Sequence, residues 1–235
     1  MIGFGKFGKR NYYEIKNLED ACLLKIDTSK KDFYDVVLNL TVVDDEIAQF
    51  IEAIEEVKEA EIGEFWIPVY APALQGNEIV FMEGKRPAIG HSFGWWEKKV
   101  KEMPTIEEKH WEVGSEYQYY AFLVYLINSL INNGWKPKKA IEAIVLDSSK
   151  LGHFCNSENA KENKFEPTGS RKVCGVFDLA NTAKFLSCTN KESGGYWLAT
   201  GNYTDTGNCF PLAELRHFDK VCTGDYNSVG WLVLK

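Results

Sequence analysis

The sequence predicts an α+β protein, because helical and strand-like patterns occupy separate stretches of the chain. Helical patterns lie between residues 44 and 146, where apolar residues recur at helical spacing behind capping residues. Beyond residue 147 the chain contains short apolar pieces separated by Gly, Asn, Asp and Thr, which favour short strands and loops. A chain of 235 residues is long enough to bury a large core.

The N-terminal region is predicted to be an arm followed by a small sheet. The first ten residues, MIGFGKFGKR, alternate Gly with Phe and basic residues, and they are too rich in Gly for a helix. We interpret them as an extended docking arm. Ala21–Asp27 and Tyr34–Val43 have the β-branched and aromatic content of strands.

An amphipathic helix follows Asp44 or Asp45, either of which can cap its first turn. Its apolar residues fall on one face, with glutamates on the other: Ile47, Phe50, Ile51, Ile54 and Val57. This helix is predicted to pack on the small sheet as scaffold. The Pro-rich stretch Phe65–Phe81 favours short strands and loops. We place a domain boundary there, which gives a docking or oligomerisation region at 1–70 and a ligand-binding domain at 71–235.

A second helix is marked by Ser115 with Gln118 three residues later, the pattern of a capping box. The run YYAFLVYLI that follows is apolar almost all round, so this helix is expected to be buried. Gly134 suits a left-handed cap at its end. Pro137 suits the first turn of another helix, Lys138–Leu146.

Composition argues against several classes of protein. The net charge is -7 and no basic stripe is present, so nucleic acid is not expected as a partner. No apolar run reaches the length of a membrane span, and no secretory signal is visible at the N-terminus. Six cysteines without such a signal are predicted to be thiols, and the absence of a C-x-x-C pair gives no indication of a zinc site.

Three phrases near the C-terminus resemble the formylglycine-generating-enzyme (sulfatase-modifying factor) family. GVFDLANT at 175–182 is similar to the family's G-L-Y-D-M-x-G-N-V-W-E-W, and LATGNY at 198–203 stands where the family has R-G-G-S-W. LRHF at 215–218 corresponds to its Arg-containing stretch, and VGWL at 229–232 to its closing G-F-R strand. The resemblance implies a C-type-lectin-like fold for the C-terminal part of the chain.

The departures from the enzymes are specific. Ala180 precedes Asn181 where the family has Gly, Ala183-Lys184-Phe185 replaces W-E-W, and the closing Arg is missing. Enzymes of the family bind copper through two cysteines near the Arg stretch. Cys209 and Cys222 lie in that region without matching the motif. A copper oxidoreductase of this type is therefore an alternative to a binding protein, and buried structural thiols are the preferred interpretation.

The same fold serves binding in phage receptor-binding tail proteins and in the variable proteins of diversity-generating retroelements. Those chains end in W-x-x-G-x-Y/N-x-x-x-G-x-F-x-L-x-L, a polar loop and a closing G-F/W strand. The stretch from Trp197 to Trp231 resembles this ending more closely than it resembles the enzymes. The resemblance implies a phage or prophage tail adhesion protein. It is expected in the virion, or in the cytoplasm before assembly.

The expected binding surface consists of polar and aromatic loop residues held on a frame of Leu212, Leu215, Val229 and Trp231. The candidate ligand-binding residues are Asn202, Tyr203, Asp205, Asn208, His217, Asp219, Asp225, Tyr226 and Asn227. The expected partners are a cell-surface protein or glycan receptor and other virion proteins, and a homo-oligomer is expected through the arm. The same residue types also serve ordinary turns, so a structural or decoration protein of the virion is a further alternative.

No catalytic residue and no cofactor is predicted. Calcium is kept as an option, because the resembled fold often carries it and Asp205, Asp219 and Asp225 offer oxygen ligands on loops.

Overall fold

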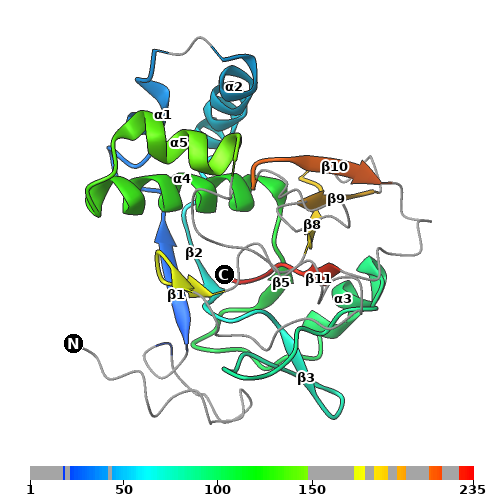
Figure 1. Cartoon of the computed structure of the whole chain (residues 1–235). Helices are drawn as coiled ribbons and strands as arrows, with labels where there is room; N and C mark the ends of the chain where they lie inside the picture. Colours follow the sequence, from blue (N-terminus) through cyan, green and yellow to red (C-terminus); the bar gives the residue numbers. More distant parts are fainter. Residues whose placement is uncertain are drawn as a thin grey trace.

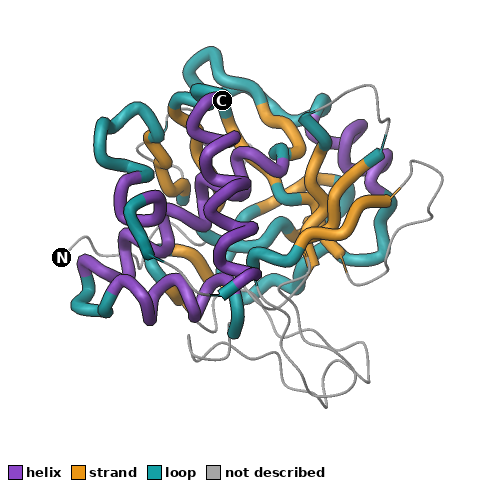
Figure 2. Tube along the Cα trace, turned by 90° about the horizontal axis from the view of Figure 1, so that it is seen from above, coloured by secondary structure: helices purple, strands orange, loops and turns teal. Residues whose placement is uncertain are grey.

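The computed structural model describes residues 18, 22–41, 44–147, 172–177, 183–189, 195–199, 212–218 and 228–235. Figure 1 shows most of the helices gathered over one side of a set of short strands, so the protein is α+β, as predicted. Seen from above in Figure 2, the longer helices lie together on one side and much of the sheet structure lies beside them.

The first elements are β1 (Leu23–Asp27), α1 (Asp35–Leu38) and α2 (Asp45–Glu59). The strand in Ala21–Asp27 and the amphipathic helix are confirmed, and the Asp44 side chain caps α2 by accepting from the N–H groups of Glu46 and Ile47. The predicted strand at Tyr34–Val43 is wrong. Its described part contains the one-turn helix α1, in which Val37 is buried, and the N-cap residue Tyr34 is buried three residues before it. Tertiary burial of that i, i+3 pair outweighs the strand preference of the valines.

The middle of the chain contains β2 (Glu64–Pro68), β3 (Ala73–Gln75), β4 (Glu78–Val80), α3 (Phe93–Val100) and β5 (Trp111–Val113). The short strands expected in the Pro-rich stretch are confirmed. The helix α3 was not predicted. Ser92 caps it by accepting from the N–H of Trp95, and it buries Phe93, Trp96 and Val100.

The next two helices along the chain are α4 (Glu116–Asn132) and α5 (Pro137–Val145), and both were predicted. The capping box is complete, because Ser115 Oγ accepts from the Gln118 N–H and Gln118 Oε1 accepts from the Ser115 N–H at 2.8 Å. Gly134 adopts a φ of +91° after the end of α4, as a left-handed cap requires. The predicted burial of α4 is confirmed, because seven of the ten residues from Ala121 to Leu130 are buried.

The C-terminal strands are short. They are β6 (Lys172–Val173), β7 (Val176–Phe177), β8 (Ala183–Ser187), β9 (Tyr196–Ala199), β10 (Leu215–Phe218), β11 (Ser228–Gly230) and β12 (Leu232–Leu234).

Two four-stranded sheets organise the described part of the chain, with strand orders β1-β2-β12-β5 and β10-β9-β8-β11. The last segment of the chain joins them, because β11 pairs with β8 in the second sheet and β12 pairs with β2 and β5 in the first. Trp231 stands between the two strands, and its N–H donates to the Phe185 carbonyl at 3.0 Å. One continuous segment therefore belongs to both sheets.

Alternate residues of these strands enter two different hydrophobic cores. On β12, Val233 enters the core under α2, α4 and α5, whereas Leu232 and Leu234 enter the core beside α3. On β9, Trp197 and Ala199 face the first core, whereas Tyr196 and Leu198 face the second. Each sheet therefore contributes side chains to both cores.

The predicted frame residues are confirmed as interior. Leu212, Val229 and Trp231 are buried, and Leu215 packs against the core partly buried. Trp231 contacts Tyr119 edge to face, with ring centroids 5.3 Å apart, and also contacts Phe65 and Phe122.

The proposed boundary between 1–70 and 71–235 stays a prediction. The first sheet bears on it, because β1 and β2 come from the first region and β5 and β12 from the second. Of the described helices, none is long and apolar enough to cross a membrane.

The close packing of Gly230 against Trp96 can be tested by substitution. A Cβ atom at this position would lie 2.7 Å from Cδ2 of Trp96, whose side chain is fully buried. We expect Gly230→Ala to lower the free energy of unfolding by about 1–3 kcal/mol, as overpacking of a core does. Chemical denaturation followed by circular dichroism measures this value.

Gly94→Ala is the matched control. Gly94 is exposed near the start of α3, and an added Cβ meets no atom within 4 Å. This substitution should raise the free energy of unfolding by up to about 1 kcal/mol, because alanine favours a helix. Equal effects of the two substitutions would contradict the packing of β11 against Trp96.

Candidate functional site

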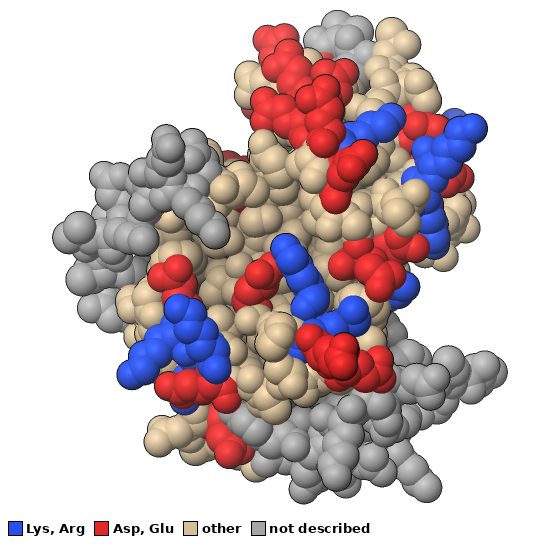
Figure 3. Space-filling view, turned by 180° about the vertical axis from the view of Figure 1, so that it is seen from behind, with Lys and Arg blue, Asp and Glu red and all other residues tan. Residues whose placement is uncertain are grey.

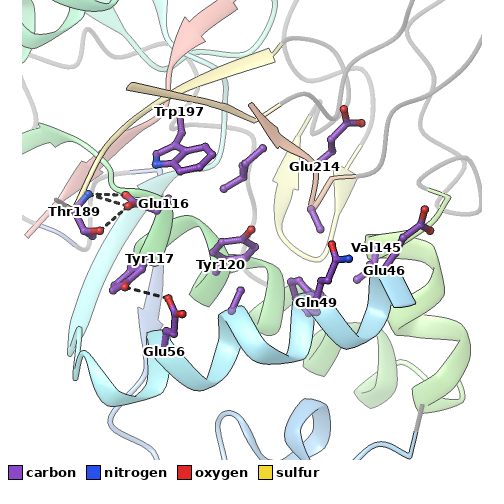
Figure 4. Close-up of a pocket in the computed structure, with 14 residues that line it drawn as sticks. Glu46, Gln49, Glu56, Glu116, Tyr117, Tyr120, Val145, Thr189, Trp197 and Glu214 are labelled. Carbon is purple, nitrogen blue, oxygen red and sulfur yellow. Dashed lines mark hydrogen bonds between the residues drawn. The ribbon is translucent and has the colours of Figure 1, made fainter. Parts of the chain in front are cut away.

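A pocket of about 580 Å³ lies where the second sheet overhangs the helices (Figure 4). One face of α2, the first turn of α4 and the strands β9 and β10 form its walls. The residues that line it are Glu46, Gln49, Phe50, Ala53, Glu56, Glu116, Tyr117, Tyr120, Val145, Thr189, Trp197, Ala213, Glu214 and Leu215. Acidic and aromatic side chains predominate among them, and none is basic.

The walls are fixed by hydrogen bonds between distant parts of the chain. The Tyr119 hydroxyl donates to the Leu212 carbonyl at 3.0 Å, and the Leu212 N–H donates to the Ile144 carbonyl at 3.1 Å. These bonds hold the turn that carries Ala213 and Glu214 against α4 and α5. That side of the pocket is therefore part of the packed structure.

Glu116 is the most enclosed carboxylate of the pocket, with only 8 % of the residue exposed. Its two oxygens accept from the Thr189 N–H, both at 2.9 Å, and Oε1 also accepts from the Thr189 hydroxyl at 2.5 Å. Within the described part of the chain, no Lys, Arg or His forms an ion pair with it. The hydrogen bonds that it accepts from described residues come from the neutral groups of Thr189, so no described residue offsets its negative charge.

Two tyrosines of α4 extend between the carboxylates (Figure 4). The Tyr117 hydroxyl donates to Glu56 Oε2 at 3.5 Å, across the gap between α4 and α2. Burial first, and then the charges of Glu56 and Glu116, raise the pKa of Tyr117. Burial and the charges of Glu116 and Glu56 raise the pKa of Tyr120 to about 12. Burial is the larger cause of both pKa shifts, and the charges of Glu56 and Glu116 add to it.

Aromatic surfaces complete the pocket. The Tyr120 ring contacts Phe50 with centroids 5.8 Å apart, and no hydrogen bond to its hydroxyl is found among the described residues. Trp197 lies on the opposite side, on β9 (Figure 4). Its ring meets His217 of β10 nearly edge-on at 5.1 Å. Tyr120 and Trp197 thus offer two ring surfaces to the same space.

Among the predicted ligand-binding residues, the structure describes His217, which is exposed on β10. It lies opposite Trp197 in the strand pairing and therefore beside the pocket. The other eight lie outside the described residues: Asn202, Tyr203, Asp205, Asn208, Asp219, Asp225, Tyr226 and Asn227. For these the binding role stays a prediction.

Of the six cysteines, the structure describes Cys22, Cys174 and Cys188. Within the described ranges, no group of three or more His, Cys, Asp or Glu side chains could hold a metal ion. The predicted calcium ligands Asp205, Asp219 and Asp225 lie outside those ranges, as do Cys209 and Cys222. Burial raises the pKa of the Cys22 and Cys174 thiols, which lowers their reactivity at neutral pH.

Sequence reasoning missed the pocket itself. Glu116 and Tyr120 were read as parts of a capped, buried helix, and the glutamates of α2 as a solvated face. One signal was available, because Glu116 and Tyr120 are four residues apart on a mostly apolar helix and therefore share a face. Nothing local indicates that α2 and β9 complete the walls.

Comparison of the chain with protein-family models, with curated proteins and with solved structures found no match.

The burial of Tyr120 beside the two glutamates can be tested by titrating its hydroxyl. At pH 11 an ordinary exposed tyrosine, with a pKa of about 10, is about nine-tenths ionised, whereas Tyr120 should remain mostly protonated. NMR of ¹³Cζ-labelled tyrosine follows each ring, and Tyr120→Phe assigns the signal. Because the pKa is raised in the folded state, the contribution of Tyr120 to stability is complete below about pH 10. It is lost as the pH rises through about 12.

Glu56→Gln should lower the pKa of Tyr120, because it removes one of the charges that raise it. Glu55→Gln removes the same charge from an exposed position of α2 that does not line the pocket. It should change that pKa less. Equal changes would mean that the pocket has no local field of its own.

Proposed function

We propose that the protein is a receptor-binding protein with a C-type-lectin-like C-terminal part, acting in adhesion by a phage or prophage tail. On this proposal the ligand is a cell-surface protein or glycan, and it binds to the sheet β8-β9-β10 and the loops around it. The N-terminal arm would join the protein to other virion proteins or to further copies of itself. The resemblance of the C-terminal phrases motivates the virion setting.

One observation carries the proposal. The segments around Trp197 and Trp231 are strands, and both tryptophans belong to the core under α2, α4 and α5, with Trp197 at its edge. Because β9 is held between β8 and β10, residues that project from this sheet are held on a rigid support. Arg216 and His217 of β10 are exposed on it. A rigid frame with polar residues at its edge suits recognition by loops.

The pocket extends this surface. It opens beside β9 and β10, and Trp197 takes part both in the frame and in the pocket wall. Tyrosine and tryptophan provide large contact areas at a low cost in side-chain entropy, which is why binding surfaces use them. A receptor that contacts β9 and β10 would therefore also reach Trp197 and Tyr120.

Cell adhesion tests the proposal. We expect the labelled protein to bind the surface of a susceptible bacterium in a panel of strains. Replacing Tyr203, Tyr226 and Asn227 together by alanine should reduce that binding at least tenfold, because a few aromatic and polar contacts carry most of the binding energy. Flow cytometry over a range of protein concentrations gives the apparent affinity.

A double variant, Asn77→Ala with Asn132→Ala, provides the control. Both residues are exposed and lie away from the C-terminal sheet, in the β3–β4 turn and at the end of α4. This variant should adhere like the parent, and thermal unfolding should be similar for all three proteins. Unchanged adhesion of the triple variant would place the binding surface elsewhere.

A further inference from the structure

We infer that the pocket between α2, α4 and β9 binds an organic cation, an alkylammonium group that inserts between Tyr120 and Trp197. This inference deepens the proposed function by naming the chemistry that the pocket selects in a receptor. It depends on that function only for the biological source of the group.

The walls of the pocket are negatively charged. Glu46, Glu56 and Glu116 line the pocket, and the described residues provide none of them with an ion pair. Glu214 is the fourth acidic residue of the lining, and Arg216 forms an ion pair with it at 2.8 Å. Three carboxylates around one pocket repel one another, and a cation inside it relieves that repulsion.

The surroundings of α2 strengthen the negative potential. This helix carries six acidic residues and one lysine, Lys58. The Nζ atom of Lys58 lies 3.9 Å from Oδ1 of Asp35. Viewed from behind, acidic side chains gather over α2 (Figure 3). An approaching cation is therefore attracted towards this side of the molecule before it reaches the pocket.

Glu116 is the buried carboxylate of the pocket. An ionised carboxylate that is 8 % exposed loses most of its hydration, and the Thr189 hydroxyl and N–H replace only part of it. A bound cation would interact with this charge at reduced dielectric, where the attraction exceeds that at an open surface. The structure thus maintains a buried negative charge at one end of the pocket.

The aromatic rings of the pocket favour an organic cation over a metal ion. Tyr120, Trp197, Phe50 and Tyr117 all line the space, and ring faces attract ammonium groups by cation–π interaction. A metal ion would require several oxygen ligands converging on one point. No such cluster occurs among the described residues. The pocket volume of about 580 Å³ also suits a small organic group.

Two cations and their neutral counterparts test the inference on the full-length protein. Choline represents a trimethylammonium headgroup and n-butylammonium a lysine-like side chain. 3,3-Dimethyl-1-butanol and 1-butanol have similar shapes without the charge. We expect at least one cation to bind with a dissociation constant on the order of 1 mM or below, as suits a ligand of few atoms. Its neutral counterpart should bind at least about tenfold more weakly.

Ligand-observed NMR titrations give the affinities, and the indole N–H signal of Trp197, assigned with Trp197→Phe, locates the site. The cation that binds more tightly identifies its source, a methylated headgroup or a primary amine. Binding of the neutral compounds as tightly as the cations would overturn the inference. Absence of binding by both cations would also overturn it.

Matched charge variants separate the pocket from the general acidity of α2. Glu46→Gln with Glu56→Gln removes two exposed carboxylates of the lining and should weaken cation binding about three- to tenfold, since such charges act partly screened. Glu52→Gln with Glu55→Gln removes two exposed charges of the same helix outside the pocket. That variant should weaken binding less than about twofold. Equal losses would mean that the cation associates with the helix surface only.

Adhesion and cation binding can fail separately. If the protein adheres to cells while neither cation binds, the proposed function stands and the inference is wrong. If a cation binds in the pocket while the protein adheres to no cell, the inference stands and the proposed function is wrong.

Discussion

The burial of the last strand segment between two hydrophobic cores is the constraint on which the remaining structure depends. Trp231 and Val233 enter one core, and Leu232 and Leu234 enter the other. Each such side chain contributes roughly 1.5–3 kcal/mol by leaving water. Since β11 and β12 pair with strands of different sheets, this segment also fixes how the two sheets lie relative to each other. The C-terminal residues therefore connect the N-terminal strands to the sheet that carries the candidate site.

The site follows from that arrangement. Trp231 packs against Tyr119 and Phe122 of α4, so the helix is held under the junction of the sheets. Glu116 and Tyr120 of the same helix then line the pocket beneath β9. A polar pocket beside a tight core is stable here because the Thr189 groups and the Tyr119–Leu212 bond satisfy polar atoms around it.

Sequence patterns predicted the elements whose signals are local. Asp44, the Ser115–Gln118 capping box, Gly134 and Pro137 marked the ends of α2, α4 and α5, since each acts within one turn of its own helix. The prediction of a strand at Tyr34–Val43 was wrong, because its valines favour a strand while burial of Val37 favours a helical turn. The helix α3 is eight residues long, and its Gly94 weakens the helical pattern. The pairing of β12 with β2 joins Leu234 to Trp66, residues 168 positions apart (234 − 66), which no local pattern encodes.

The candidate site illustrates the same limit for function. His217 was expected on a loop, whereas it lies on the strand β10 opposite Trp197. However, Glu56, Glu116 and Trp197 meet only because three distant segments pack together. Each has an ordinary explanation when taken alone: a solvated helix face, the first turn of a helix, and a core aromatic. In the folded chain, the carboxylates acquire aromatic neighbours and Glu116 is buried, and both changes increase the attraction of the pocket for an organic cation. Selectivity here is a property of the packing, and it would be retained only while the terminal strand keeps α4 and β9 in place.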